Sequence, residues 1–144
     1  MALSLLTIIP SGQRDGRSQK LESQMHSKDW WSSLLASIDG KDTRAFLGFL
    51  TEDAEFRFAN NPPALGHEAV GAGVDGFFGA IKASHHQLHR IWEDAETAAC
   101  FGDVTYTRLD GRDVTVPFVN VFYFRDGKIT RYLIHIDLAP LFAA

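Results

Sequence analysis

The stretch P-F-V-N-V-F-Y-F-R-D-G-K-I-T-R-Y-L-I-H-I-D, residues 117–137, decides the fold of this chain. Runs rich in β-branched and aromatic residues flank Asp126-Gly127. An Asp-Gly pair between such runs is typical of a two-residue hairpin, because a type I′ turn needs positive φ at both central residues. The stretch therefore predicts two long antiparallel strands joined at this turn.

The predicted turn also sets a register, in which Asn120 pairs with Leu133 and Phe118 pairs with His135. Because side chains alternate along a strand, every second residue then shares a face. One face would carry Phe118, Asn120, Phe122, Phe124, Ile129, Arg131, Leu133, His135 and Asp137. A core does not accommodate an amide, an imidazole and a carboxylate unless each finds a partner. We therefore expect this face to line a pocket.

The opposite face of the predicted hairpin is largely apolar. It would carry Val119, Val121, Tyr123, Tyr132, Ile134 and Ile136. A soluble monomer seldom exposes an apolar patch of this size. We therefore expect a homodimer that forms through the outer face of the sheet.

Composition limits the remaining possibilities. The chain has 144 residues, 45% of them apolar and 22% charged, which fits one globular domain. The net charge is −4 and the basic residues are dispersed, so the sequence shows no cluster of basic residues of the kind that binds nucleic acid. The single cysteine, Cys100, lies in an apolar run and is expected to be a buried thiol. No Cys/His cluster has the spacing of a zinc site, so we expect no metal.

Residues 1–24 differ in composition from the rest of the chain. An apolar run at 3–9 is too short to span a bilayer and lacks the preceding basic residues of a signal peptide. Residues 11–24 are polar and rich in Gly, Arg and Ser. We expect a flexible N-terminal arm at 1–24, a domain at 25–144, and a cytoplasmic protein without a membrane contact.

Apolar spacing predicts three helices before most of the strands. A stripe at 31, 34, 35 and 38 indicates a helix over 28–38, and Asp42 or Thr43 would cap a second helix. An alternating strand follows at 54–60, and Gly66 opens a third helix. Strands are expected at 85–93 and 97–109, before the hairpin. This order predicts an α+β fold: a cone formed by a curved antiparallel sheet wrapped around three helices.

A second hairpin is expected at Asp110-Gly111. Its two-residue register would pair Asp103 with Phe118 and Phe101 with Asn120. Both Asp103 and Phe101 would then share the pocket face with Asn120, although a β-bulge anywhere would shift this register by one residue.

Several motifs give the chain a resemblance to a known superfamily. They are D-A-x-F-x-F at 53–58, G-H-E-A-V at 66–70, the stretch 116–129 and I-D-L-A-P-L at the C-terminal end. In this order they resemble the nuclear transport factor 2-like superfamily, and within it the SnoaL-like branch. The resemblance implies a cone-shaped α+β barrel. The superfamily includes ketosteroid isomerases, polyketide cyclases, epoxide hydrolases, dehydratases and non-catalytic binding or dimerisation modules.

Only some of the catalytic residues of these related families have a counterpart in this sequence. Phe58 or Ala59 stands where ketosteroid isomerases place their base. Phe56 and Phe58 stand where limonene epoxide hydrolases have a Tyr and an Asn, whereas Asp137 matches their terminal Asp. SnoaL-like cyclases rely on an Asp acid/base in an apolar pocket, for which Asp137 and Asp103 are the candidates.

These considerations give a set of candidate site residues. Asp137 would be the acid/base, His135 its partner, Asp103 a further acid/base, and Asn120 a donor to a substrate oxygen. The expected ligand-lining residues are Asn120, Phe58, Trp92, Phe101, Phe118, Phe122 and Leu133. The structural alternatives are a turn cap for Asp137, a core imidazole for His135 and a surface turn for Asp103. His85, His86 and His89 look like a cluster, but alternation separates His86 from the other two.

The favoured function is a cofactor-independent isomerase or cyclase that transfers protons on a small, apolar, ring-type substrate. The alternative is a non-catalytic module for small-molecule binding or dimerisation. A third hypothesis is a degenerate epoxide hydrolase.

Overall fold

A computed structural model describes residues 25–144, so the arm predicted at 1–24 lies outside the described residues. The elements are α3 (Lys28–Asp39), α4 (Thr43–Leu47), β1 (Leu50–Phe58), β2 (Ala64–Leu65), α5 (Gly66–Ala80), β3 (Ala83–Glu93), β4 (Thr97–Thr107), β5 (Asp113–Arg125), β6 (Lys128–Ile136) and α6 (Ala139–Phe142). The predicted order of helices and strands is confirmed. The first strand begins at Leu50 rather than at Ala54, and the short elements β2 and α6 were not expected.

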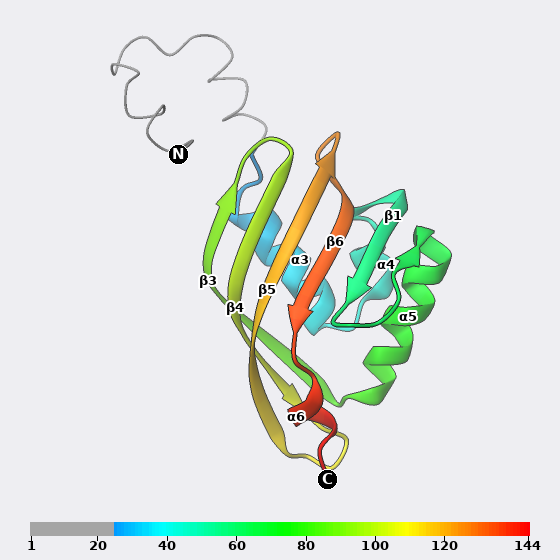
Figure 1. Ribbon diagram of the computed structural model, residues 1–144, viewed down its shortest axis with the longest axis vertical. Coiled ribbons are helices and arrows are strands. Elements are labelled where there is room, and N and C mark those ends of the chain that lie inside the picture. The colour runs from blue at the N-terminus through cyan, green and yellow to red at the C-terminus, as the bar shows by residue number, and fades with distance from the viewer. Residues whose placement is uncertain (1–24) are drawn as a thin grey trace.

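The six strands form one mixed sheet in the order β2-β1-β6-β5-β4-β3. Strands β1 and β6 run parallel, and the other neighbours are antiparallel. Figure 1 shows that the sheet curves and that α3, α4 and α5 all lie on its concave side. The α+β prediction is therefore confirmed, with a parallel β1–β6 pair in place of a purely antiparallel sheet. None of the helices in residues 25–144 is long and apolar enough to cross a membrane.

Helices α3 and α4 begin at ordinary side-chain caps. The side chain of Ser27 accepts a hydrogen bond from the backbone N–H of Trp30, and that of Asp42 accepts one from Ala45. The core between helices and sheet contains Trp31, Leu34, Phe46, Leu50, Val70, Val74, Phe78, Ile129 and Tyr132, all buried. Each such apolar side chain contributes about 1.5–3 kcal/mol by leaving water.

The predicted Asp126-Gly127 turn is confirmed, but the register beyond it is wrong. Asp126 and Gly127 have φ values of 53° and 77°, as a type I′ turn requires. A register shift then leaves Thr130 as an extra residue on β6, so that Phe122 pairs with Tyr132 instead of Arg131. Because a bulge of one residue shifts the alternation of side chains, every side chain of β6 after Thr130 lies on the opposite face from the one predicted.

The bulge brings the more apolar set of β6 side chains into the core. Tyr132, Ile134 and Ile136 face the helices, and Leu133, His135 and Asp137 fall on the other side. The prediction that Leu133, His135 and Asp137 share a face with Asn120 is therefore wrong. Burying the apolar set gains hydrophobic stabilisation that the polar set cannot supply.

The second hairpin also differs from its prediction, because its loop contains three residues rather than two. The backbone N–H of Arg108 donates to Arg112 at 2.8 Å, and Gly111 has a φ of 89°. Asp103 therefore pairs with Pro117, and Phe101 pairs with Val119. This shift places Asp103 and Phe101 on the outer face and turns Cys100, Val104 and Tyr106 inward.

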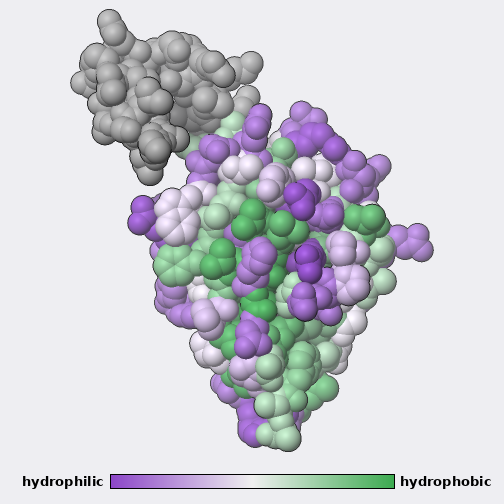
Figure 2. Space-filling model, viewed as in Figure 1, coloured by the Kyte–Doolittle hydropathy of each residue, from purple (hydrophilic) through white to green (hydrophobic). Residues whose placement is uncertain are grey.

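No helix of residues 25–144 lies over the outer face of the sheet. Figure 2, in the view of Figure 1, shows apolar side chains along the middle of this face with polar groups around them. Its large exposed apolar side chains are Trp92, Phe101, Val119 and Tyr123. Trp92 stacks on Phe101 with their ring centroids 5.8 Å apart. Of the patch predicted from sequence, Val119, Val121 and Tyr123 lie here, whereas Tyr132, Ile134 and Ile136 point inward.

Candidate functional site

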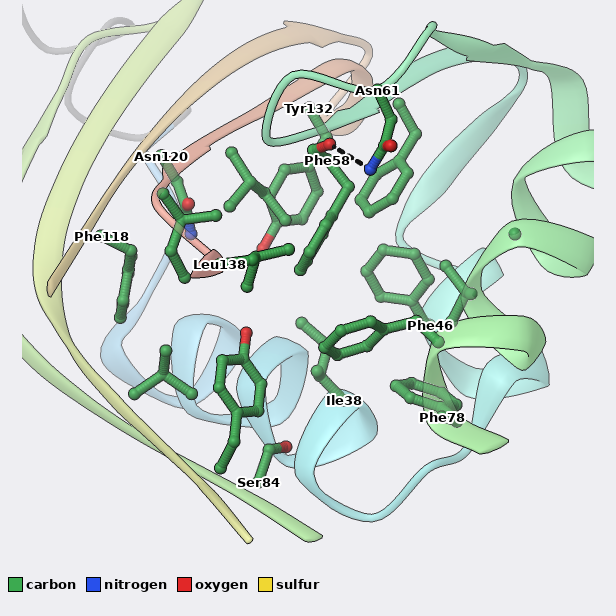
Figure 3. Close-up of a pocket in the computed structure, with 18 of the residues that line it drawn as sticks. Ile38, Phe46, Phe58, Asn61, Phe78, Ser84, Phe118, Asn120, Tyr132 and Leu138 are labelled. Carbon is green, nitrogen blue, oxygen red and sulfur yellow. Dashed lines mark hydrogen bonds between the residues drawn. The ribbon is translucent and has the colours of Figure 1, made fainter. Parts of the chain in front are cut away.

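A cavity of about 390 Å³ lies between the concave face of the sheet and the helices. Figure 3 shows Phe118, Asn120 and Tyr132 on its sheet side, with Ile38, Phe46 and Phe78 on its helix side. Apolar residues make most of the lining: Ile38, Phe46, Phe56, Phe58, Pro62, Ala64, Val74, Phe77, Phe78, Val104, Phe118, Ile134, Ile136, Leu138 and Phe142. A cavity of this size and lining suits a small, largely apolar ligand.

Two residues distant in sequence form an acid–base pair at the cavity. Asp39 is the last residue of α3, and His86 lies on β3 with its ring in the cavity lining. The Nδ1 atom of His86 is 2.5 Å from Oδ1 of Asp39, and the backbone N–H of His86 donates to Oδ2 at 3.0 Å. The hydroxyl of Ser84 donates to the same carboxylate at 2.8 Å. The side chains of His86 and Asp39 are only 11% and 22% exposed.

These contacts fix the charge and the tautomer of the pair. Burial favours a higher pKa for Asp39, but the hydrogen bonds and positive charge of His86 and the Ser84 hydroxyl outweigh burial and hold its pKa below the ordinary value. Asp39 is thus a carboxylate at neutral pH. Because a carboxylate only accepts, Nδ1 of His86 carries a proton, and Nε2 is the basic nitrogen of the neutral ring. Such an arrangement can accept and return a proton.

Asn120 is the amide of the cavity wall. It is 2% exposed, and among the described residues its Oδ1 atom has no hydrogen-bond partner. A buried polar atom without a partner costs about 1–3 kcal/mol. Burial raises the pKa of the neighbouring Cys100 thiol to about 12, although the backbone and side-chain N–H groups of Asn120 oppose this effect. Cys100 is therefore a neutral thiol at neutral pH.

Tyr106 and Tyr132 add two hydroxyls to the lining. Burial, with the charge of Asp39 as a further cause, raises the pKa of both phenols. Both remain protonated at neutral pH and can donate a hydrogen bond to a ligand oxygen.

The structure places the residues predicted from sequence in three groups. Phe58, Phe118 and Asn120 line the cavity. Phe122 is buried in the core, where its ring packs 4.5 Å from that of Tyr132. The others lie outside the cavity, on the outer face or at the end of β6: Trp92, Phe101, Asp103, Leu133, His135 and Asp137.

The predicted acid/base residues have other partners. Oδ2 of Asp103 lies 2.8 Å from Nε2 of His89 on the outer face, and both side chains are exposed. Asp137 accepts a hydrogen bond from the backbone N–H of Ala139 at 3.0 Å, which is the capping alternative considered from sequence. His135 and Leu133 line a second pocket, between β1 and β6 on the outer side of the sheet. The placement that suggested catalytic roles for Asp103, His135 and Asp137 is therefore wrong.

Sequence reasoning missed the pair of Asp39 and His86. Strand alternation separates His86 from His85 and His89, and this separation was the available signal. Nothing local marks Asp39, which lies 47 residues before His86 in sequence. In residues 25–144 no group of three or more His, Cys, Asp and Glu side chains is placed to hold a metal ion.

The Arg108-Leu109-Asp110 sequence has a structural role at the end of the cone. Nη1 of Arg108 donates to the backbone carbonyls of Leu141 at 2.9 Å and Ala143 at 2.6 Å. Arg108 thereby holds α6, whose Phe142 lines the cavity. Neither Arg108 nor Asp110 belongs to the cavity lining.

Comparison with known proteins agrees with this architecture. An NTF2-like protein of unknown function from Burkholderia pseudomallei is 19% identical, with a TM-score of 0.72 over 80% of this chain and 96% of that chain. TerC, crystallised with polyporic acid, is 20% identical, with a TM-score of 0.69 over 78% and 92%. A Pseudomonas putida protein proposed to be a polyketide cyclase is 20% identical, with a TM-score of 0.69 over 81% and 96%.

At these identities the structural likeness shows the fold alone. No curated protein matches the chain in sequence. The family model of the SnoaL-like domain, however, matches residues 32–132, which is more than half of the chain. The chain therefore belongs to the SnoaL-like domain family and has its NTF2-like fold.

Proposed function

We propose that the cavity binds a small, largely apolar, ring-type molecule and transfers a proton on it without a cofactor, with His86 as the acid/base. One observation carries this proposal: the ring of His86 lines the cavity while its Nδ1 atom is held by the carboxylate of Asp39. The proposed reaction type is the proton transfer that was expected from sequence. The acid/base role is assigned to His86 instead of Asp137, because Asp137 lies outside the cavity.

The proposed step follows from the tautomer of His86. Nε2 removes a proton from a carbon next to a carbonyl group of the bound ring, and the ring becomes an enolate. Asp39 stabilises the imidazolium that forms, and the neutral phenols of Tyr106 and Tyr132 donate to the enolate oxygen. Return of the proton to another carbon gives an isomer. Attack by the enolate carbon on a second carbonyl instead closes a ring and gives an alkoxide, which takes the proton back from His86. A positioned base of this kind contributes about 10²–10⁴-fold to rate.

Deuterium exchange tests this proposal without knowledge of the natural substrate. 2-Tetralone is a bicyclic ketone with enolisable C–H bonds, and loss of its α-proton signal in D2O measures proton removal directly. The native protein should accelerate this exchange. His86→Gln should lower the acceleration by about 100-fold or more while ligand affinity changes only a few-fold. His85→Gln, on the outward face of the same strand, is the matched control and should have no effect.

The possible results separate the hypotheses. Binding of 2-tetralone without exchange would contradict catalysis and leave the non-catalytic binding module. Exchange that persists in His86→Gln would contradict the role of His86. Absence of binding would contradict the ring-type ligand itself.

We also propose that two copies of the chain pair through the outer face of the sheet. Support comes from Trp92, Phe101, Val119 and Tyr123, which are between 36% and 47% exposed on a face that no helix of the described chain covers. Large apolar side chains gathered in this way are typical of protein interfaces.

A further inference from the structure

A second pocket, of about 400 Å³, lies on the outer side of the sheet, where β1 and β6 run parallel. The lining of the inner cavity includes none of its polar side chains, and the proposed proton transfer uses none of them. The two sites therefore differ in the chemistry that they offer. The polar residues that line the second pocket are Glu55, Arg57, Asn60, Arg131 and His135.

The parallel register explains why basic side chains meet at this pocket. Arg57 on β1 pairs with Leu133 on β6. Arg131 and His135 lie two residues before and after Leu133, so alternation places them on the same face and on either side of it. Both are diagonal neighbours of Arg57 across the strand pair, within reach of a long side chain. Two guanidinium groups and an imidazole thus surround one half-buried leucine.

Arg131 is held in place by two neighbours. Its Nε atom donates to Oε2 of Glu55 at 2.7 Å, and its guanidinium carbon lies 4.8 Å from the centre of the Tyr123 ring. A guanidinium group carries five N–H donors, so Arg131 keeps donors for a ligand while its position is fixed. Tyr123 belongs to the exposed apolar patch, and the pocket therefore adjoins that patch on its β6 side.

Arg57 supplies a positive charge that no carboxylate of residues 25–144 offsets. Its Nη2 atom donates to Oδ1 of Asn60 at 3.3 Å, and it takes part in none of the ion pairs of the described chain. Glu55 offsets the charge of Arg131, so the lining carries a net positive charge even when His135 is counted as neutral. The His135 ring offers an N–H in either protonation state. Such a set of donors attracts an anion and repels a cation.

We propose that this pocket binds the oxyanion group of a small molecule, a carboxylate or a phosphate, between Arg57 and Arg131. The planar fork of an arginine matches two oxygens of either group. Leu133 offers a contact to the apolar part of the ligand next to the charged group. The site is separate from the inner cavity, so it does not depend on the proposed proton transfer.

Small probes without a ring test this site on the native protein. Inorganic phosphate and propionate carry the anion, and propylammonium has the size of propionate with the opposite charge. Calorimetry at low ionic strength should show saturable binding of at least one of the two anions and no binding of propylammonium. Tighter binding of propionate would identify the ligand as a carboxylate, whereas tighter binding of phosphate would identify a phosphorylated molecule.

Two variants should change the affinity for the anion in opposite directions. Arg57→Gln removes a guanidinium group and should weaken binding by about 10-fold or more, the usual effect of losing a charge-assisted hydrogen bond. Glu55→Gln removes the carboxylate that competes for Arg131 and should tighten binding. Arg44→Gln, on α4 away from the outer face, is the matched control and should have no effect. A purely structural role would not produce opposite changes.

The outcomes that would overturn the site are distinct from those that test the inner cavity. Failure of both anions to bind at millimolar concentration would overturn it, and so would equal binding of propylammonium. Affinity that is unchanged in Arg57→Gln, or lowered equally in Arg44→Gln, would place the anion elsewhere and contradict the proposal. The comparison of anion and cation on the native protein decides the matter even if a variant does not fold.

Discussion

The carboxylate of Asp39 holds the imidazole of His86 by two hydrogen bonds, one to Nδ1 at 2.5 Å and one to the backbone N–H at 3.0 Å. This contact joins the end of α3 to β3 and fixes both the position and the tautomer of the ring. A helix end and a strand thus supply together what neither could supply alone: a carboxylate-bound imidazole on a residue that lines an apolar cavity.

The first prediction concerns Asp39→Asn. The amide retains the shape of the carboxylate but cannot stabilise an imidazolium, and it can hold the ring in the wrong tautomer. We expect the exchange of 2-tetralone to slow by about 100-fold or more, with little change in affinity. Asp29→Asn, in the first turn of the same helix, is the control for the lost charge. Equal exchange rates for Asp39→Asn and the native protein would show that the carboxylate does not assist His86.

The second prediction concerns acid stability. The pKa of Asp39 is lowered in the folded protein, so this group stabilises the fold above its unfolded pKa of about 3.9. That contribution is lost as the pH falls through the lower, folded value. Between pH 5 and pH 2.5, Asp39→Asn should therefore lose less of its free energy of unfolding than the native protein loses.

Urea unfolding at a series of pH values provides this measurement. Asp29→Asn should retain the acid dependence of the native protein. If Asp39→Asn and the native protein show parallel loss of stability, the bond to His86 is not a source of acid sensitivity.

The third prediction concerns His26, which anchors the start of the domain. Its Nδ1 atom lies 2.5 Å from Oε2 of Glu93, and its Nε2 atom lies 2.7 Å from the carbonyl of Gly127. The ring packs between Trp30 and Phe124, with centroids 3.8 and 4.5 Å away. His26→Ala leaves the buried Glu93 without this partner, and we expect it to cost about 3 kcal/mol.

A protein that begins at Met25 is the matched comparison for His26→Ala. It keeps His26, so its midpoint of thermal unfolding should stay within about 8 °C of that of the full chain, equivalent to roughly 1–2 kcal/mol. A larger loss would place part of the stability in residues 1–24. A stable His26→Ala protein would show that the anchor at Glu93 is dispensable.

The fourth prediction concerns the outer face. Val119→Lys places a charge in the middle of the apolar patch and should convert a dimer into a monomer, with little loss of stability because Val119 is 45% exposed. Thr105→Lys, further along the same face on β4, should leave the dimer intact. Sedimentation at micromolar concentration measures both. A native protein that sediments as a monomer would overturn the proposed dimer.

The order of elements could be predicted from sequence, whereas the faces of two strands could not. Apolar spacing located the helices, and Asp126-Gly127 located the main turn. The face on which a side chain lies changes whenever the strand pairing shifts by one residue. Thr130 in a bulge and Leu109 in a three-residue loop each shifted the pairing by one residue. The apolar character of Tyr132, Ile134 and Ile136 was a signal that this set belongs in the core. The contact between Asp39 and His86 depends on tertiary packing, which no local pattern reveals.

The last prediction separates the site proposed from structure from the site expected from sequence. Asp137 is exposed, and its carboxylate accepts a hydrogen bond from Ala139 at the start of α6. Asp137→Asn keeps an acceptor at this position, so it should leave the exchange of 2-tetralone unchanged. Asp137→Ala removes the acceptor and should cost about 0.5–1 kcal/mol, again without a change in exchange rate.

Paired measurements make this contrast decisive. Exchange kinetics and urea unfolding of Asp137→Asn, Asp137→Ala and His86→Gln, measured together, place each residue either in the chemistry or in the scaffold. We expect the His86 variant to lose exchange and the Asp137 variants to retain it. If instead Asp137→Asn loses exchange by about 100-fold while His86→Gln keeps it, the acid/base lies at the end of β6 and the catalytic role proposed for His86 is wrong.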